Sequence, residues 1–134
     1  AAAISLHIGD WQRIQWEKAA RFAVDALEGV LSRGLDAGTV ANINIPVLDE
    51  DDPVGTRVVP VSPSPSRDSY DEAPGENGDR VFTIRQSMAF PDRPPQTDVA
   101  CLYDRYITVS PLHFDRTDHD RLHAWREAIR QSDG

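Results

Sequence analysis

The chain has 134 residues, with 14 Lys+Arg against 22 Asp+Glu, a formal net charge of −8 and a single cysteine. This length suits one ordinary domain, and one cysteine excludes an internal disulfide. Its apolar stretches are too short for a membrane span or a signal peptide, and its negative charge argues against non-specific nucleic-acid binding. We therefore expect a soluble, acidic, cytoplasmic protein.

The charged residues are strongly biased toward arginine over lysine and toward aspartate over glutamate. Lys18 is the only lysine beside thirteen arginines, and 16 Asp stand against 6 Glu. Adaptation to high salt would favour such a surface, because hydrated carboxylates keep a protein soluble while salt screens their repulsion. A GC-rich genome would produce the same bias, so both explanations stay open. An acidic balance also fits an enzyme that meets an anionic substrate through a metal ion rather than through lysines.

Residues 1–46 predict a βαβ unit, which makes the fold class α/β. Ala1–Leu6 is apolar and predicts a short strand buried in a parallel sheet. A 3.6-residue period then predicts a helix of about six turns, with Asp10 as its N-cap and Gly34 at its end. Thr39–Ile45 predicts a second strand, closed by Pro46. Because the chain begins in a strand and without Met, we expect it to be the downstream part of a longer polypeptide.

Residues 47–98 predict an acidic loop, Asp49–Asp52, followed by an extended β-hairpin arm with strands at 55–62 and 80–87. The polar residues between these strands, 63–79, leave the order of that segment undecided. An arm of this kind cannot bury its apolar face locally. We therefore expect it to pack on another subunit.

The last part of the chain predicts a return to the core and a terminal helix. Residues 99–116 contain a short helical turn at Ala100–Tyr103 and a strand at Tyr106–Ser110 that ends at Pro111. In residues 117–134, Thr117 or Asp118 caps a helix at Asp120–Arg130. Its apolar residues recur at helical spacing. They are Leu122, Trp125, Ala128 and Ile129.

The residue patterns alone identify no site. Asp49–Asp52 could attract a divalent cation but lacks the spacing of a calcium loop, so a solvated loop is the better interpretation. His119 and His123 have zinc-like spacing, yet surface pairing with nearby aspartates is the better interpretation there too. Cys101 has no defined partner, and Ser5 lacks a nucleophile elbow. We assign no catalytic residue and no metal ligand, and the substrate-binding residues stay unknown.

The order of landmarks along the chain is more informative than any one motif. The landmarks are Ala3–Leu6, Trp16–Ala20, Asn42–Pro46, Thr56-Arg57, Thr97–Val99, Tyr106–Leu112, Asp115 and Thr117. Two of them, N-I-N-I-P and Y-I-T-V-S-P-L, are specific in combination. This succession resembles the C-terminal half of the SurE family, the stationary-phase survival proteins, over nearly the whole chain.

The resemblance implies a Rossmann-like three-layer α/β/α sandwich with a protruding β-hairpin arm and a swapped C-terminal helix. It implies a metal-dependent phosphomonoesterase, a nucleoside 5′/3′-monophosphatase also described as an acid phosphatase. Its divalent metal, Mg or Mn, polarises the phosphoryl group and activates water or stabilises the leaving oxygen. Members are homo-oligomers, either dimers or tetramers, which suits an arm and a tail that need a partner subunit.

The chain departs from the family in one respect. The family's metal ligands, two adjacent aspartates with a serine and an asparagine, belong to the N-terminal half, which is missing here. Asp51 and Asp52 are not that pair, because they follow the N-I-N-I-P strand. We therefore transfer no site residue, and we expect no metal bound by this segment and no activity from it alone. It would supply core, oligomer contacts and walls of the nucleotide pocket.

Two alternatives stay open. The chain could be a stand-alone, non-catalytic oligomerisation module that kept the arm and the tail. It could also be an unrelated α/β binding domain whose N-I-N-I-P match is accidental.

Overall fold

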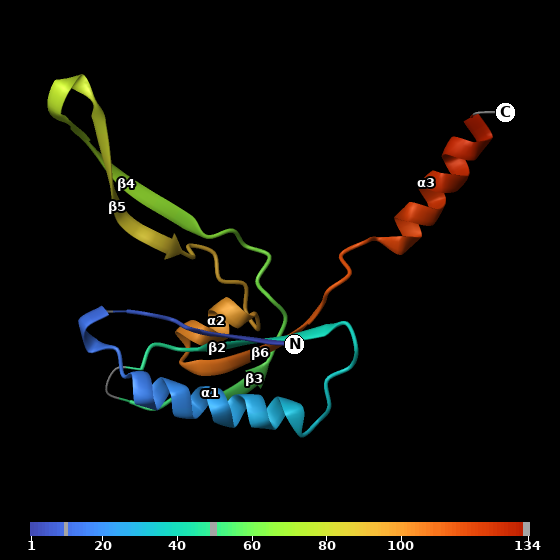
Figure 1. Cartoon of the computed structure of the whole chain (residues 1–134), viewed down its shortest axis with the longest axis horizontal. Helices are drawn as coiled ribbons and strands as arrows, with labels where there is room; N and C mark the ends of the chain where they lie inside the picture. The colour runs from blue at the N-terminus through green and yellow to red at the C-terminus, as the bar shows by residue number, and fades with distance from the viewer. Residues whose placement is uncertain (10, 49–50, 133–134) are drawn as a thin grey trace.

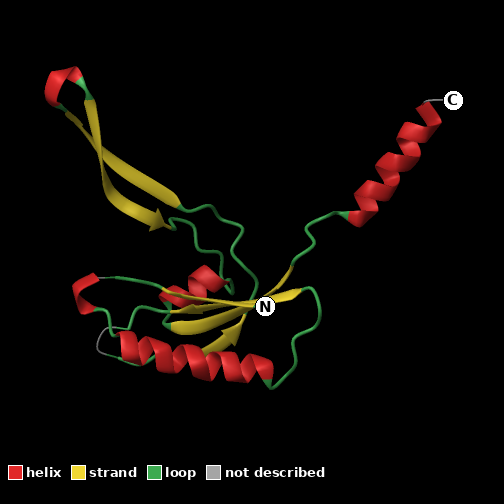
Figure 2. Cartoon of the chain, in the orientation of Figure 1, coloured by secondary structure: helices red, strands yellow, loops and turns green. Residues whose placement is uncertain are grey.

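A four-stranded mixed sheet with a helix on each face forms the core of the chain (Figure 1). The computed structural model describes residues 1–9, 11–48 and 51–132. From one edge to the other, the strands of the sheet are β1 (Ala2–Leu6), β2 (Thr39–Ile45), β6 (Tyr106–His113) and β3 (Gly55–Val58). A two-stranded hairpin and the terminal helix project from this core in different directions (Figure 2). The α/β fold class is confirmed.

The predicted βαβ unit is present. β1 pairs in parallel with β2, with Ile4 opposite Ile43, and β2 has the bounds that the sequence predicts. The expectation that Ala1–Leu6 is buried is wrong, because β1 is the edge strand of the sheet and Ile4 is 41% exposed. Among the described residues no strand pairs with the outer edge of β1. Its side chains therefore have β2 as a neighbouring strand on one side and none on the other.

The connecting helix α1 (Trp16–Leu31) is shorter than predicted. Its 16 residues make about four and a half turns instead of six. A separate 3-10 turn, η1 (Trp11–Arg13), precedes it. The backbone of Gln15 is not helical, so α1 begins only at the next residue, Trp16. The predicted cap Asp10 lies outside the described residues. Gly34 has a positive φ of 83°, which suits a glycine just beyond a helix end.

The two faces of β2 differ in chemistry. Ile43 and Ile45 lie under α1, where they pack with Ala19 and Ala26. The alternate side chains of the strand face α2 (Asp98–Tyr103), on the other side of the sheet (Figure 1). That face is polar, and its Asn44 amide donates to the Thr108 hydroxyl on the neighbouring strand at 3.3 Å.

β6 runs past the predicted stop at Pro111 and ends at His113. Pro111 lies opposite Ala41 of β2 in an antiparallel pair. The Ala41 N–H donates to the carbonyl of Ala1, which lies on the other side of β2 from β6. Ala41 and Pro111 are therefore a pair without mutual backbone hydrogen bonds, and the missing N–H of the proline costs no bond between β2 and β6. A proline at such a position does not terminate the strand.

The hairpin arm exists, but its first strand is not the predicted one. Residues 55–62 were expected in the arm, whereas β3 pairs in parallel with β6 in the core sheet. The arm consists of β4 (Arg67–Pro74) and β5 (Arg80–Ala89). β4 lies within the segment 63–79, whose order the sequence leaves undecided. Both of its faces are exposed, so no alternation of polar and apolar residues marks it as a strand.

The two remaining helices are close to their predicted positions. α2 begins slightly earlier than the predicted turn, with Thr97 as its N-cap. The terminal helix α3 (His119–Ser132) is capped by Asp118, whose carboxylate accepts the Arg121 N–H at 2.9 Å. In the described part of the chain, no helix is both long and apolar enough for a membrane span.

The core packing predicts a large effect of truncating β2. Ile43 is 0% exposed, so the variant Ile43→Ala leaves a cavity and lowers the free energy of unfolding by about 2–5 kcal/mol. Urea denaturation measures this loss. Val24→Ala is the matched control, because Val24 lies on α1 and is 52% exposed, and its effect stays within about 0.5 kcal/mol. Equal losses in the two variants would contradict the described core.

Candidate functional site

The carboxyl ends of β1 and β2 meet at one edge of the sheet. Open α/β sheets bind their ligands outside the carboxyl ends of parallel strands. Here β1 leads into His7, whose N–H donates to Ile45 at the end of β2 at 2.9 Å. α2 packs beside this edge. This edge is therefore the candidate functional site.

A cavity of about 510 Å³ opens between the end of β1 and α2, and we call it the α2 cavity. Its volume lies in the range of small-molecule sites, about 300–1,000 Å³. Apolar and aromatic side chains make up most of its wall, with a few polar groups among them. The lining residues are Ser5, Leu6, His7, Ile8, Asn44, Phe90, Asp98, Val99, Leu102 and Tyr103.

A chain of hydrogen bonds fixes the polar floor of the α2 cavity. The Ser5 hydroxyl donates to Asn44 Oδ1 at 2.6 Å. Asn44 Nδ2 in turn donates to the Thr108 hydroxyl at 3.3 Å. Three adjacent strands, β1, β2 and β6, are thus joined by side chains as well as by backbone. The Ser5 and Asn44 side chains are consequently held in place before any ligand arrives.

Two rings meet at the wall of the α2 cavity. The His7 and Tyr103 ring centroids lie 5.5 Å apart, and the Arg93 guanidinium lies 4.2 Å from the centre of the Tyr103 ring. Burial lowers the pKa of His7, because an apolar setting disfavours the charged imidazolium. His7 is therefore neutral near pH 7 and presents an uncharged ring to the cavity.

Asp98 is the charged side chain that lines the α2 cavity. It is only 7% exposed, and its Oδ1 accepts the backbone N–H groups of Ser62 and Val99, each at 2.7 Å. In the described chain Oδ2 accepts no hydrogen bond, and no buried side-chain oxygen there lacks a partner. Solvent therefore reaches Oδ2, which leaves this oxygen available as an acceptor.

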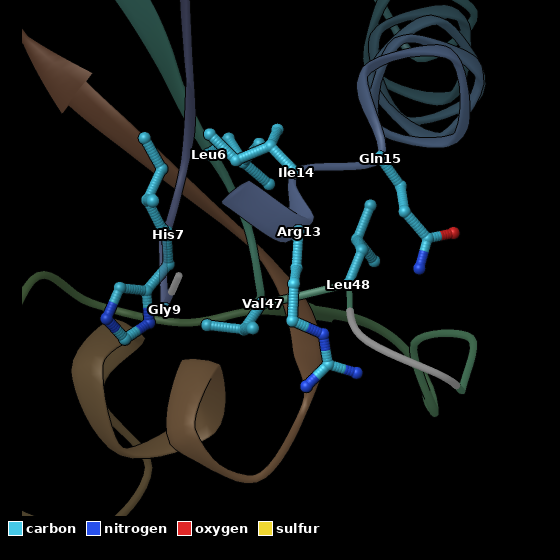
Figure 3. Close-up of a pocket in the computed structure, with 9 residues that line it drawn as sticks. Leu6, His7, Gly9, Arg13, Ile14, Gln15, Val47 and Leu48 are labelled. Carbon is cyan, nitrogen blue, oxygen red and sulfur yellow. The ribbon is translucent and has the colours of Figure 1, made fainter. Parts of the chain in front are cut away.

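A second, much smaller hollow lies on the other side of His7, toward η1. Figure 3 shows Val47 between His7 and Arg13 there, with Gln15 at the start of α1. Its volume of about 10 Å³ has room for roughly one water molecule. It is too small for an organic ligand, so the α2 cavity is the better candidate.

The described part of the acidic loop forms ion pairs. Asp51 lies 2.8 Å from Arg105, and Asp52 lies 2.9 Å from Lys18. The hydrogen bond from Lys18 lowers the pKa of Asp52. These contacts fasten the loop to α1 and to the turn before β6. The other members of the cluster, residues 49–50, lie outside the described residues.

The histidines near the C-terminus do not converge. His119 opens α3 and its Nε2 lies 2.7 Å from Asp115 Oδ2, while His113 ends β6. His123 is exposed on α3. Within residues 1–9, 11–48 and 51–132, no three His, Cys, Asp or Glu side chains are grouped closely enough to hold a metal ion.

Cys101 is a buried free cysteine in α2. Arg57 Nη1 lies 3.8 Å from its sulfur, and the same guanidinium lies 3.7 Å from the centre of the Tyr106 ring. The thiol is thus packed between α2 and the sheet. No His ring is among its described hydrogen-bond partners, so this geometry gives no Cys–His dyad.

Of the residues that line the α2 cavity, the sequence patterns mark only Ser5 as a site candidate, a possible nucleophile. They mark Thr97–Val99 only as a landmark and leave His7 unmarked. One signal was available, because His7 directly follows a predicted parallel strand and residues in that position lie at the ligand-binding edge. The partners from α2 could not be found this way, since they are far away in the chain.

The chain resembles known proteins over most of its length. The family described as "Survival protein SurE" matches residues 1–68. The chain is 33% identical over 124 residues to the 5′-nucleotidase SurE of Bradyrhizobium diazoefficiens, covering 88% of this chain and 46% of that protein. It is 27% identical over 125 residues to the 5′-nucleotidase SurE of Symbiobacterium thermophilum, covering 93% of this chain and 49% of that protein.

A solved structure has the same fold. The crystal structure of SurE protein from Aquifex aeolicus matches with a TM-score of 0.73 at 23% identity, covering 96% of this chain and 51% of that chain. The chain therefore spans about half the length of the relatives it matches.

The turn before α3 predicts a pH dependence. Hydrogen bonds from the Thr117 hydroxyl and backbone N–H, and then from His119, hold the pKa of Asp115 well below its ordinary value of 3.8. The folded turn prefers the ionised carboxyl, so its stabilisation is complete above about pH 4 and is lost as pH falls through the lowered pKa. Carboxyl NMR titration then gives a midpoint below 3.8 for Asp115.

Thr117→Val removes the hydroxyl donor and raises that midpoint toward 3.8. Thr83→Val, on the exposed arm, is the control and leaves it unchanged. An Asp115 midpoint that is the same with and without the Thr117 hydroxyl would refute the assigned cause.

Proposed function

The chain belongs to the SurE family, and on this premise we propose that it forms part of a metal-dependent phosphomonoesterase acting on nucleoside 5′- and 3′-monophosphates. The observation that carries the proposal is the family match over residues 1–68, which includes the βαβ unit and its carboxyl edge. Relatives of this chain are named 5′-nucleotidases. The α2 cavity supports the proposal because it offers a ligand-sized space at that edge.

The metal ion of this proposal does not fit the described residues by themselves. Asp51 and Asp52 already form ion pairs with Arg105 and Lys18, and the described part of the chain brings no three metal-binding side chains together. Because the metal ligands of the family belong to its N-terminal half, we propose that residues outside this chain hold the ion, Mg or Mn. What these residues offer is a rigid sheet edge, a neutral His7 ring and the carboxyl group of Asp98.

The arm and the tail support a homo-oligomer. On the arm, Tyr70, Phe82 and Ile84 share one face, which we call the arm face, and all three are exposed. On α3, Trp125 is 64% exposed. Exposed aromatic side chains at such density are typical of contact surfaces. We propose that second copies of the chain cover both surfaces, with α3 exchanged between subunits, to give a dimer or a tetramer in the cytoplasm.

A non-catalytic oligomerisation module is the second candidate. The exposed arm face and the exposed apolar residues of α3 favour it, because neither needs catalysis for its function. The α2 cavity favours the first candidate, since a purely structural module has no use for a ligand-sized site beside the sheet edge.

Activity should require more than these 134 residues. The purified chain with Mn²⁺ is expected to release no phosphate from a nucleoside 5′-monophosphate above the buffer rate, because the described residues form no metal centre. A chimera in which this chain replaces the matching region of the Bradyrhizobium enzyme is expected to restore hydrolysis. Phosphate release by each protein is the measurement.

Two outcomes count against the proposal. Hydrolysis by the isolated chain would disprove the assignment of the ion to residues elsewhere. A chimera that folds, as judged by circular dichroism and gel filtration, but never hydrolyses a nucleoside monophosphate would favour the non-catalytic module.

Light scattering after gel filtration tests the oligomer. The chain is expected to elute as a dimer or tetramer, and Trp125→Asp should weaken association at least about tenfold, because a buried Trp at an interface contributes about 2 kcal/mol or more. Phe82→Arg tests the arm face separately. Arg126→Ala, on the same helix as Trp125, is the matched control. A folded wild-type chain that runs as a monomer would contradict both contact surfaces.

A further inference from the structure

The α2 cavity has two parts of different chemistry. Aromatic and aliphatic side chains surround most of it, including Phe90, Tyr103 and the neutral ring of His7. Ser5, Asn44 and Asp98 supply the polar groups. A ligand that fills it must therefore pair a flat or apolar body with a few hydrogen-bonding groups. A phosphate group alone does not match, because the Asp98 carboxylate in the wall would repel it.

The Tyr103 ring is held in one orientation. It contacts the His7 ring at 5.5 Å between centroids and the Arg93 guanidinium at 4.2 Å from its own centre. Arg93 lies over one face of the ring, and Tyr103 remains 42% exposed, so the uncovered part of the ring offers a π surface at low entropic cost. Any of the nucleobases can stack on such a ring, because each base has a π face.

The polar groups of the cavity are suited to the rest of a nucleoside. Asp98 Oδ2 is a solvent-accessible acceptor, whereas Oδ1 is occupied by the Ser62 and Val99 N–H groups. Sugar hydroxyls and exocyclic amino groups are donors that such an oxygen accepts. The Ser5–Asn44 pair, 2.6 Å between its oxygens, provides further fixed polar atoms beside it.

We propose that the α2 cavity binds the nucleoside part of the substrate, with its base stacked on Tyr103 and a donor group on Asp98. This assignment rests on the proposed phosphatase function and adds to it the residues that recognise the nucleoside. Tyr103 and Asp98 then determine specificity for nucleotides over other phosphomonoesters. The phosphate extends out of the cavity, away from the Asp98 carboxyl group.

Calorimetric titration of the 134-residue chain with adenosine, ribose 5-phosphate and inorganic phosphate tests the assignment without any hydrolysis. Adenosine is expected to bind saturably, whereas the two probes without a base bind at least about tenfold more weakly, since stacking contributes about 1–3 kcal/mol. No adenosine binding, or equal binding of ribose 5-phosphate, overturns the assignment.

Variants separate recognition from packing. Tyr103→Leu should weaken adenosine binding about tenfold, while Tyr103→Phe keeps the ring and restores it. Asp98→Asn preserves the Oδ1 acceptor but replaces Oδ2 with a donor, so it also weakens binding. Tyr70→Leu on the arm is the matched control and has no effect. Equal binding by the Leu and Phe variants at Tyr103 would show that stacking is absent.

The same variants in the active chimera provide an independent measurement. Tyr103→Leu should raise KM for adenosine 5′-monophosphate and leave KM for ribose 5-phosphate, which has no aromatic ring, unchanged; equal changes in the two would overturn the assignment. Adenosine binding with an inactive chimera would keep the assignment and reject the phosphatase proposal. An active chimera with no adenosine binding would do the reverse.

Discussion

Burial of one face of β2 beneath α1 is the constraint on which the rest of the structure depends. Ile43 and Ile45 pack against Ala19 and Ala26, and small residues on the helix let it approach the sheet closely. Because side chains alternate along a strand, a register shift of one residue would place asparagines under α1. The apolar face therefore sets the pairing of β2 with its neighbours on both sides.

The candidate site is a consequence of the same alternation. With Ile43 and Ile45 directed toward α1, Asn44 faces α2 and joins Ser5 and Thr108 in a hydrogen-bonded row across three strands. Apolar side chains gain little by packing against such a polar row. α2 covers it only in part, and the uncovered part, with Ser5 and Asn44, forms the floor of the α2 cavity. The packing that stabilises the core thus also produces a rigid, partly polar space at the ligand-binding edge of the sheet.

The arm and α3 follow a different principle from the core. The two elements project away from the sheet (Figure 1), and large apolar side chains on both are exposed, among them Phe82 and Trp125. Burying such residues releases about 25 cal/mol per Å² of apolar surface, and within one copy of the chain this gain is not made. The exposed edge strand β1 is a similar case. In the proposed oligomer, second copies of the chain cover the arm face and α3.

The sequence by itself determined the βαβ unit, the bounds of β2 and the apolar face of α3, because hydrophobic periodicity and capping act between residues near in the chain. It also carried the ordered landmarks of the SurE family. Only the tertiary structure decided that β3 joins β6, that β4 lies in a segment without periodicity, and that β1 is an edge. It also brought Tyr103 and Asp98 to His7. The β3–β6 pairing and the meeting of α2 with His7 join residues about 50 to 96 positions apart, and no local pattern encodes which distant strand or helix will meet.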